Sequence, residues 1–468
     1  MTATDGRTAL GDPSVQELAE SLRGTVLRDG DAGYDDARTG WNGMFHDARP
    51  DLVVRCAGAS DVIAAVRFAR SAGLEIAVKA GGHSIPGFST IQGGMLIDLS
   101  PMDGIRVDPT AKRVVVQGGS LWQDVDAETQ EFGLATTGGL VSTTGVAGFT
   151  LGGGIGHLMR KHGLALDNLV GADVVTADGR FVHASETSEP ELFWGLRGGG
   201  GNFGIVTAFE FELHNVGPMV YGGPIFFAGE DAEKVFQAFA DWTGAGLPDE
   251  ISAFYDVLVA PPAPFLPEEV HGKQICAVIF CHSGDHTEGE KLLAPIRLAA
   301  TPVADLGGPI PYAALNSLID ALWPAGGRYY FRSGYMAELS PEAMAAVVQS
   351  HATTPMAQCE IHIHDLGGAV ARVGEDETAF SGRDSRYALN IVCGWQDPAD
   401  DEANLAWIRD VGARLDEFCT GAVYSNFMGS EGDERTKAAY GDKLPRLQAL
   451  KRAWDPDNVF RRNFNVRP

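Results

Sequence analysis

The segment Gly199-Gly200-Gly201-Asn202-Phe203-Gly204 decides between two ways of binding a dinucleotide. Its letters fit GxGxxG, the fingerprint in which a strand precedes the glycines and a helix follows them, so that the pyrophosphate meets the N-terminus of that helix. Here Phe209, Phe211 and Leu213 alternate with small or acidic residues, which predicts a half-buried strand after the glycines. The segment therefore lacks the helix that a Rossmann dinucleotide site requires, and the Rossmann interpretation is rejected.

Glycine is unusually abundant, with 59 glycines in 468 residues, and much of the excess lies in loops of the first half of the chain. Any one of these loops could be a simple tight turn. Together they predict a cradle, because bare backbone can approach a pyrophosphate and an aromatic ring without obstruction by Cβ. The loops are Ala80–Ser84, Gly118-Gly119, Gly138-Gly139, Gly145–Gly148, Gly152–Gly156 and Gly198–Gly204.

Composition limits the class of protein. Apolar residues make up 44% and charged residues 21%, which excludes a disordered chain or a small disulfide scaffold. The net charge of -26 argues against nucleic acid, whose phosphates it would repel. No Walker loop, HExxH or GxSxG motif occurs.

The lack of a recognisable targeting signal and the spacing of the cysteines suggest a cytoplasmic protein with no membrane association. Met1–Pro13 shows no signal peptide, and the uncharged segment 133–159 is too rich in glycine, serine and threonine for a membrane helix. The cysteines lack CxxC spacing and are expected to be reduced core thiols. They are Cys56, Cys276, Cys281, Cys359, Cys393 and Cys419.

Hydrophobic periodicity divides the chain into three parts. Residues 1–213 predict an α+β domain with glycine in its loops, residues 214–420 a second α+β domain, and residues 421–468 a C-terminal return with a helix broken at Pro445. The second domain is expected to have helices at 230–242, 288–299, 341–351 and 401–418, and strands at 251–259, 274–281, 328–339, 359–365 and 387–395.

Several motifs together resemble one family. Val78-Lys79-Ala80-Gly81-Gly82-His83-Ser84, Leu192-Phe193-Trp194-Gly195-Leu196-Arg197 with the glycine run that follows, and the tail Asp455-Pro456-Asp457-Asn458 are similar to FAD-linked oxidases. The family is the berberine bridge enzyme-like branch of the vanillyl-alcohol oxidase superfamily. The resemblance covers nearly the whole chain. It implies a two-domain FAD-binding fold of the vanillyl-alcohol oxidase type, with a substrate domain of antiparallel sheet and helices.

The resemblance also implies how FAD is held. His83 is expected to bond covalently to the 8α-methyl carbon of the flavin, while members with a second, cysteinyl link carry cysteine where this chain has Val141. Thr144 falls where the family controls access of oxygen to the flavin. The expected FAD-binding residues are Lys79, Ala80, Gly81, Gly82, His83, Ser84, Gly138, Thr144, Gly145, Gly148, Gly152, Gly153, Gly156, His157, Gly204, Ile205, Val206, Asn463 and Asn465.

The sequence evidence for substrate-binding residues is less specific than that for the FAD-binding residues. The resemblance places Tyr424 of a Tyr-x-Asn segment, and Asn390, beside the substrate. His362 shares one strand face with Glu360 and His364. That face could line the substrate cavity, hold a metal ion, or be an ordinary polar sheet face. The expected catalytic residues are Tyr424, Asn390 and His362, and no resident metal is expected.

The resulting function is an FAD-dependent oxidase with one histidyl link. It is expected to oxidise an alcohol, amine, phenolic or benzylic group of a small organic molecule, with molecular oxygen as acceptor and hydrogen peroxide as product. A flavin-dependent dehydrogenase or oxidative cyclase of natural-product tailoring is the alternative in the same fold. A non-catalytic binder of small molecules is the alternative from another class. The sequence leaves substrate identity and oligomeric state open.

Overall fold

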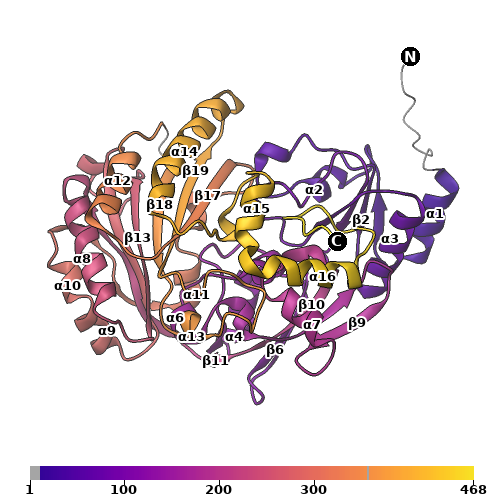
Figure 1. Cartoon of the computed structure of the whole chain (residues 1–468), viewed down its shortest axis with the longest axis horizontal. Coiled ribbons are helices and arrows are strands. Elements are labelled where there is room, and N and C mark those ends of the chain that lie inside the picture. The colour runs from indigo at the N-terminus through magenta and orange to yellow at the C-terminus, as the bar shows by residue number, and fades with distance from the viewer. Residues whose placement is uncertain (1–10, 356–357) are drawn as a thin grey trace.

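The computed structural model describes residues 11–355 and 358–468 (Figure 1). Most of the segment Met1–Pro13, for which no signal peptide is expected, lies outside the described residues. Within the described part, the strands form sheets of four, five, two and eight strands. The α+β class expected from the sequence is confirmed.

The four-stranded sheet near the N-terminus is mixed, in the order β1-β2-β4-β3. Strands β2 and β3 run parallel to β4, and β1 runs antiparallel to β2. Its strands are β1 (Thr25–Leu27), β2 (Leu52–Arg55), β3 (Ile76–Lys79) and β4 (Met95–Asp98), and the helices of this region are α1 (Asp12–Ser21), α2 (Tyr34–Arg38) and α3 (Ala59–Ser71).

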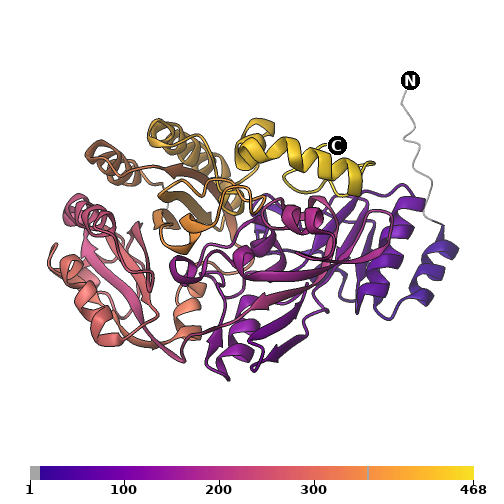
Figure 2. The ribbon, with the colours of Figure 1, turned by 60° about the horizontal axis from the view of Figure 1, so that its bottom comes forward.

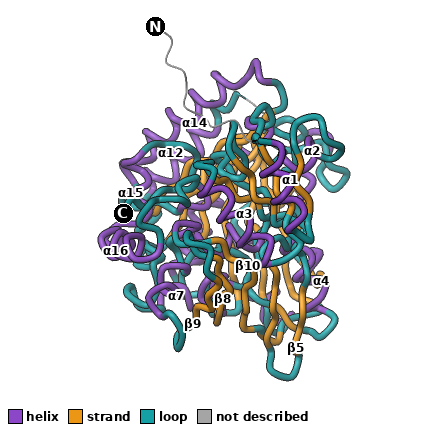
Figure 3. The backbone as a smooth tube through the Cα atoms, turned by 90° about the vertical axis from the view of Figure 1, so that its right-hand side faces the viewer, coloured by secondary structure: helices purple, strands orange, loops and turns teal. Residues whose placement is uncertain are grey.

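The five-stranded sheet is antiparallel, in the order β5-β6-β10-β8-β9 (Figure 3). The glycine segment that fits GxGxxG follows a helix and precedes strand β10, the reverse of the Rossmann order. The strands are β5 (Ile105–Asp108), β6 (Arg113–Gln117), β8 (Leu169–Val175), β9 (Phe181–Ser185) and β10 (Ile205–Glu212). The helices are α4 (Trp122–Gln130), α5 (Val146–Gly152), α6 (Met159–His162) and α7 (Pro190–Leu196), and β7 (Leu134–Ala135) pairs with β11 (His214–Asn215).

The eight-stranded sheet, called the large sheet below, is antiparallel in the order β15-β12-β14-β13-β18-β19-β17, with β16 also paired to β12. Its strands are β12 (Met219–Ala228), β13 (Ile251–Val259), β14 (Gln274–His282), β15 (Pro302–Asp305), β16 (Gly308–Pro311), β17 (Arg328–Met336), β18 (Gln358–Asp365) and β19 (Tyr387–Trp395). The helices of this region are α8 (Ala232–Gly244), α9 (His286–Leu292), α10 (Ala294–Arg297), α11 (Tyr312–Asn316), α12 (Pro341–His351), α13 (Ala369–Arg372) and α14 (Asp401–Leu415).

The two faces of the large sheet have different roles. Helices α8, α12 and α14 cover its outer face, where Tyr255, Ile361 and Ile391 contribute to one apolar core (Figure 1). Because successive side chains of a strand point to opposite faces, the residues between them turn towards the rest of the molecule. This inner face therefore supplies the polar side chains described below.

The end of the chain returns to the first half of the molecule. Helices α15 (Asp433–Tyr440) and α16 (Leu444–Trp454) lie over the part that contains β10 and α7 (Figures 1 and 2). The ammonium group of Lys451 is fully buried and donates to the carbonyls of Asn202 and Phe460 and to Asp455, at 2.6–2.9 Å. All three of its N–H donors thus have acceptors, which fixes the tail against the glycine segment.

Two sequence expectations need correction. Cys359 and Cys393 form a disulfide, so not all six cysteines are reduced thiols. They lie directly opposite each other on β18 and β19, a long-range pairing that the linear spacing of cysteines does not reveal. The helix expected at 288–299 is divided into α9 and α10, with Pro295 in the first turn of the second helix. In the described part of the chain, no helix is long and apolar enough to span a bilayer.

Candidate active site

A cavity of about 360 Å³ separates the glycine loops from the inner face of the large sheet. The loop after β3, helix α5 and the start of β10 form one side, and residues of β18 and β19 form another. Phe460 and Asn463 of the C-terminal return close part of the wall. Segments that are far apart in the sequence therefore enclose one space.

Bare backbone brings the glycine loops together. A Cβ on Gly81 would lie 2.4 Å from the Cα of Gly145, and a Cβ on Gly156 would lie 1.9 Å from the carbonyl oxygen of Gly138. These contacts leave no room for a side chain. Gly148 differs, because it borders the cavity and a Cβ there would meet nothing within 4 Å. Some glycines thus hold the loops against each other, whereas Gly148 leaves space for a ligand.

His83 borders the cavity and is held by an aromatic neighbour. The indole of Trp41 stacks on its imidazole, with 3.9 Å between ring centroids. Burial lowers the pKa of His83 to about 4, so the imidazole is neutral near pH 7. Its Nε2 atom is shielded from solvent and has no hydrogen-bond partner among the described residues. A neutral imidazole with a fixed ring is a competent nucleophile.

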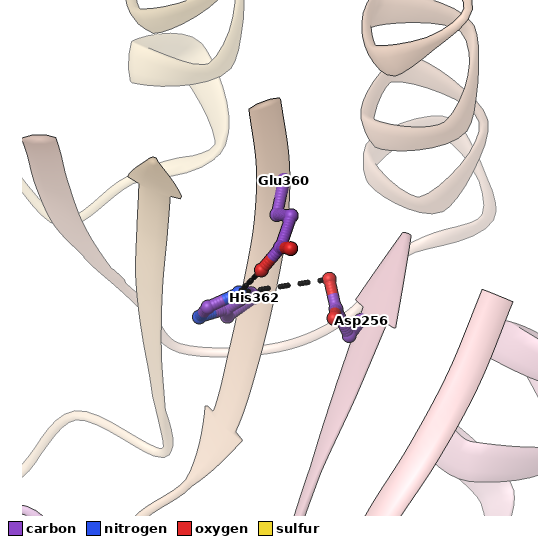
Figure 4. A group of neighbouring side chains, drawn as sticks. All are labelled: Asp256, Glu360 and His362. Carbon is purple, nitrogen blue, oxygen red and sulfur yellow. Dashed lines mark hydrogen bonds and ion pairs between the residues drawn. The ribbon is translucent and has the colours of Figure 1, made fainter. Parts of the chain in front are cut away.

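A row of polar side chains crosses the inner face of the large sheet. Asp256 on β13 lies opposite His362 on β18, and His362 lies opposite Asn390 on β19. The Nε2 atom of His362 is 2.9 Å from an oxygen of Glu360 and 3.6 Å from an oxygen of Asp256 (Figure 4). The three side chains are buried, and their nitrogen and oxygen atoms lie within 4.8 Å of one another. Either a shared proton or a metal ion would fit between them.

Burial and charge act in opposite directions in this cluster. Burial raises the pKa of Asp256 well above its ordinary value, although His362 opposes the shift. Burial alone would lower the pKa of His362, but Asp256 and Glu360 together raise it. His364, the next residue on the same face, has its pKa lowered well below the ordinary value by burial and by His362. The two histidines therefore prefer different protonation states.

Tyr424 is placed differently from the other two expected catalytic residues. Its side chain is buried, and its hydroxyl oxygen accepts hydrogen bonds from the N–H groups of Gly154 and Ile155 and from the amide of Asn426, at 2.8, 3.3 and 3.0 Å. The hydroxyl group of Ser333 donates to the Tyr424 carbonyl at 2.9 Å. Tyr424 does not border the cavity, and its catalytic role stays a prediction.

Most of the residues expected from the sequence border the cavity. They are Ala80, Gly81, Gly82, His83, Ser84, Thr144, Gly145, Gly148, Gly152, Gly204, Ile205, Val206, Asn463, His362 and Asn390. The other expected residues do not border it, namely Lys79, Gly138, Gly153, Gly156, His157, Asn465 and Tyr424. The ammonium group of Lys79 turns away to the carbonyl of Ala37, at 2.5 Å, and burial lowers the pKa of His157 to about 4.

Sequence reasoning missed Trp41 and Asp256. Trp41 precedes the glycine loops by some forty residues along the chain, so nothing local connects it with His83. Asp256 is a single acid within the apolar strand Ile251–Val259. This isolated position is the sequence feature that could have identified it as a site residue. An unpaired acid in a buried strand is costly unless it has a partner or a function.

The cavity fits a flavin dinucleotide. Glycine loops provide bare N–H groups, Ile205, Val206 and Phe460 provide apolar wall, and the side-chain oxygen of Asn463 is buried without a partner among the described residues. A model described as "FAD binding domain" matches residues 50–185, and one described as "Berberine and berberine like" matches residues 423–467. A FAD-linked oxidoreductase of Dictyostelium discoideum is 33% identical over 458 residues, 97% of each chain.

The chain therefore belongs to the berberine bridge enzyme-like family, and it is an FAD-linked oxidoreductase with the fold of the vanillyl-alcohol oxidase superfamily. Among solved structures, 6-hydroxy-D-nicotine oxidase from Arthrobacter nicotinovorans matches with a TM-score of 0.85 and 28% identity, over 96% of this chain and 98% of that one. Glucooligosaccharide oxidase from Acremonium strictum matches with a TM-score of 0.84 and 25% identity, over 97% and 98%.

Proposed function

We propose that the protein is an oxidase of small organic molecules whose FAD is covalently bound through His83. The observation that carries this proposal is the neutral, stacked imidazole of His83 at the edge of a glycine-lined cavity. The solved glucooligosaccharide oxidase, which has the same fold, is described as revealing a novel flavinylation. Because Nε2 of His83 is shielded, we assign the link to Nδ1.

We propose that the flavin has a single covalent link, the one to His83. The cavity borders Val141 where family members with two links have cysteine, and no cysteine is among the described residues that line the cavity. The glycine loops and Asn463 would hold the dinucleotide, with Ile205 and Val206 towards the adenine. The bound flavin would supply the electron acceptor for oxidation of an alcohol, amine, phenolic or benzylic group.

The substrate would lie against the inner face of the large sheet. Phe331, Val392 and Phe427 provide apolar surface there, while Asn390 and His362 provide polar contacts. The side-chain oxygen of Asn390 is buried without a partner among the described residues, so it is available to accept a hydrogen bond from a substrate O–H or N–H. This combination favours a compact substrate with one polar reacting group.

Oxygen is the proposed final acceptor, with hydrogen peroxide as product. Thr144 borders the cavity at the position where the family controls access of oxygen, and its side chain is small. Rapid reoxidation of photoreduced protein by air, within seconds, supports the oxidase. Reoxidation that takes many minutes would assign the protein to the dehydrogenases or oxidative cyclases.

The covalent link is tested by precipitating the purified protein with acid. Yellow, fluorescent flavin should remain with the wild-type polypeptide, and His83→Ala should release it into the supernatant. His183→Ala is the matched control, because His183 is half-exposed on β9 and pairs with Asp173 away from the cavity. Release of all flavin from the wild-type protein would refute the covalent proposal. Flavin bleaching under nitrogen by alcohols, cyclic amines and hydroxylated aromatics then identifies the substrate class.

A further inference from the structure

The imidazole of His362 lies between the cavity and two buried carboxylates. His362 borders the cavity, whereas Asp256 and Glu360 do not. Its Nε2 atom faces both carboxylates, and Figure 4 shows the other ring nitrogen on the side away from them. Among the described residues, no group hydrogen-bonds to that second nitrogen, Nδ1. One ring nitrogen of His362 is thus held by the carboxylates, and the other is left for a ligand in the cavity.

The contact with Glu360 selects one tautomer of neutral His362. A carboxylate accepts hydrogen bonds and cannot donate one, so Nε2 must carry the proton at 2.9 Å from Glu360. The lone pair of neutral His362 is then on Nδ1. One oxygen of Asp256 is buried without a hydrogen-bond partner and lies 3.6 Å from Nε2, and a positive charge on His362 favours ionisation of this carboxyl against the effect of burial.

Resting on the function proposed above, we propose that Glu360 and Asp256 are positioning residues that hold His362 as the base for substrate oxidation. The bound FAD would accept a hydride from carbon of a substrate H–C–X–H, where X is oxygen or nitrogen. Nδ1 of His362 would take the proton from X, so that a C=X double bond forms, and Glu360 and Asp256 would stabilise the imidazolium. The proton passes to water after product release.

The surroundings of His362 define which groups influence it. On β18 these are Glu360 and His364, on β13 they are Asp256 and the uncharged ring of Phe254, and on β19 it is the uncharged amide of Asn390. His364 favours its neutral form. The carboxyl groups that face His362 are therefore those of Asp256 and Glu360. Both raise the pKa of His362, so removing either should lower it.

The positioning is tested on holoprotein labelled with ¹⁵N-histidine, with His362→Gln assigning the signals of this residue. We expect His362 to titrate above 6.5 and to carry its proton on Nε2 when neutral. In Glu360→Gln its pKa should fall by about one unit or more, and Asp256→Asn should shift it in the same direction. Asp173→Asn, which alters the half-exposed pair with His183, should leave His362 unchanged. An unshifted pKa in Glu360→Gln, or a neutral form protonated on Nδ1, would overturn the proposal.

Its role as base is tested by the pH profile of anaerobic flavin reduction, using the compound that bleaches the flavin fastest in the screen. Because the base must be neutral, the rate should rise with pH through the raised pKa of His362, and Glu360→Gln should move this rise to lower pH. An unmoved profile would refute the base. Wild-type flavin that no compound reduces would count against the proposed function, while the NMR experiment would still decide the positioning. The wild-type protein could instead contain stoichiometric metal that is absent from Glu360→Gln. In that case a metal ion rather than a proton would lie between the three side chains, and this proposal would be overturned.

Discussion

The indole of Trp41 lies nearly parallel to the imidazole of His83, at 19° and with 3.9 Å between the ring centroids. Trp41 also stacks with Tyr329 at 3.8 Å, and its N–H donates to the carbonyl of Trp323 at 2.9 Å. These contacts hold the indole from the side of the large sheet. Through Trp41, residues at least 282 positions further along the chain thus help to set the orientation of His83.

Trp41→Leu should therefore slow attachment of flavin to His83 by about tenfold or more, since small errors in the placement of a nucleophile are costly. Trp41→Phe keeps an aromatic face and should attach flavin more completely than Trp41→Leu. The measurement is the ratio of flavin fluorescence to protein on a denaturing gel as apoprotein is incubated with FAD. Equal rates in Trp41→Leu and the wild type would show that the stacking does not position His83.

Gly81→Ala and Gly148→Ala should have different effects although both glycines border the cavity. A Cβ on Gly81 would collide with backbone of Gly145, so this change should lower the free energy of unfolding by about 1–3 kcal/mol even without FAD. Gly148→Ala adds a methyl group to open space within helix α5, where alanine is the better helix former. It should keep apoprotein stability and lower FAD content. Urea unfolding of apoprotein and flavin absorbance measure the two effects, and equal destabilisation by both changes would contradict this assignment.

Asp126 should make the protein less stable as pH rises. Burial raises its pKa from 3.8 to about 7, although Asn316 donates to it at 2.7 Å. Between these two pH values the folded protein keeps a proton that the unfolded chain has lost, so the free energy of unfolding falls as pH increases. Asp126→Asn removes this charge and keeps an oxygen acceptor for Asn316.

The stability advantage of Asp126→Asn over the wild type should therefore grow between pH 5 and pH 8, by about 1 kcal/mol or more. Urea unfolding at the two pH values measures it. Glu128→Gln, a change at an exposed position of the same helix α4, is the control for loss of one negative charge. A constant difference at both pH values would show that Asp126 is ionised throughout.

Val141→Cys should create a second flavin link. Val141 borders the cavity and packs against the cluster of Trp41, Ile85 and Trp323, and family members with two links have cysteine at this position. In the His83→Ala background, Val141→Cys should restore flavin that survives acid precipitation. Val141→Ser in the same background is the control without a thiol. Flavin fully released from the cysteine variant would show that position 141 does not reach the ring.

Local patterns predicted several elements closely. Runs of strand-forming residues predicted Ile251–Val259 and Tyr387–Trp395 with the observed bounds, and Pro341 marked the start of α12. Strand β12 was not predicted, because Gly222, Gly223 and Pro224 disfavour a strand by their local preferences. In the fold this segment pairs with β14 through eight residues, and tertiary pairing overrides the local preference.

The candidate site was predictable to the extent that its residues belong to motifs. The loop containing Gly81 and His83 borders the cavity as expected, whereas Lys79 in the same motif turns away from it. The neighbour relation between Asp256 and His362 depends on the register of β13 against β18. Register between strands a hundred residues apart is a property of the assembled sheet, so no local pattern contains it.

The returning C-terminal segment has a consequence for biogenesis. Arg462 donates to the carbonyl of Thr90, 372 residues earlier, at 2.9 Å, and Val466 donates to Asn202 at 2.9 Å. Contacts of such long sequence separation form late, because the intervening chain must first be ordered. On the ribosome the first half of the chain is made well before its last partner emerges. Capture of the cofactor in its final enclosure must therefore follow synthesis of this C-terminal segment, which places cofactor loading late in the maturation of the protein.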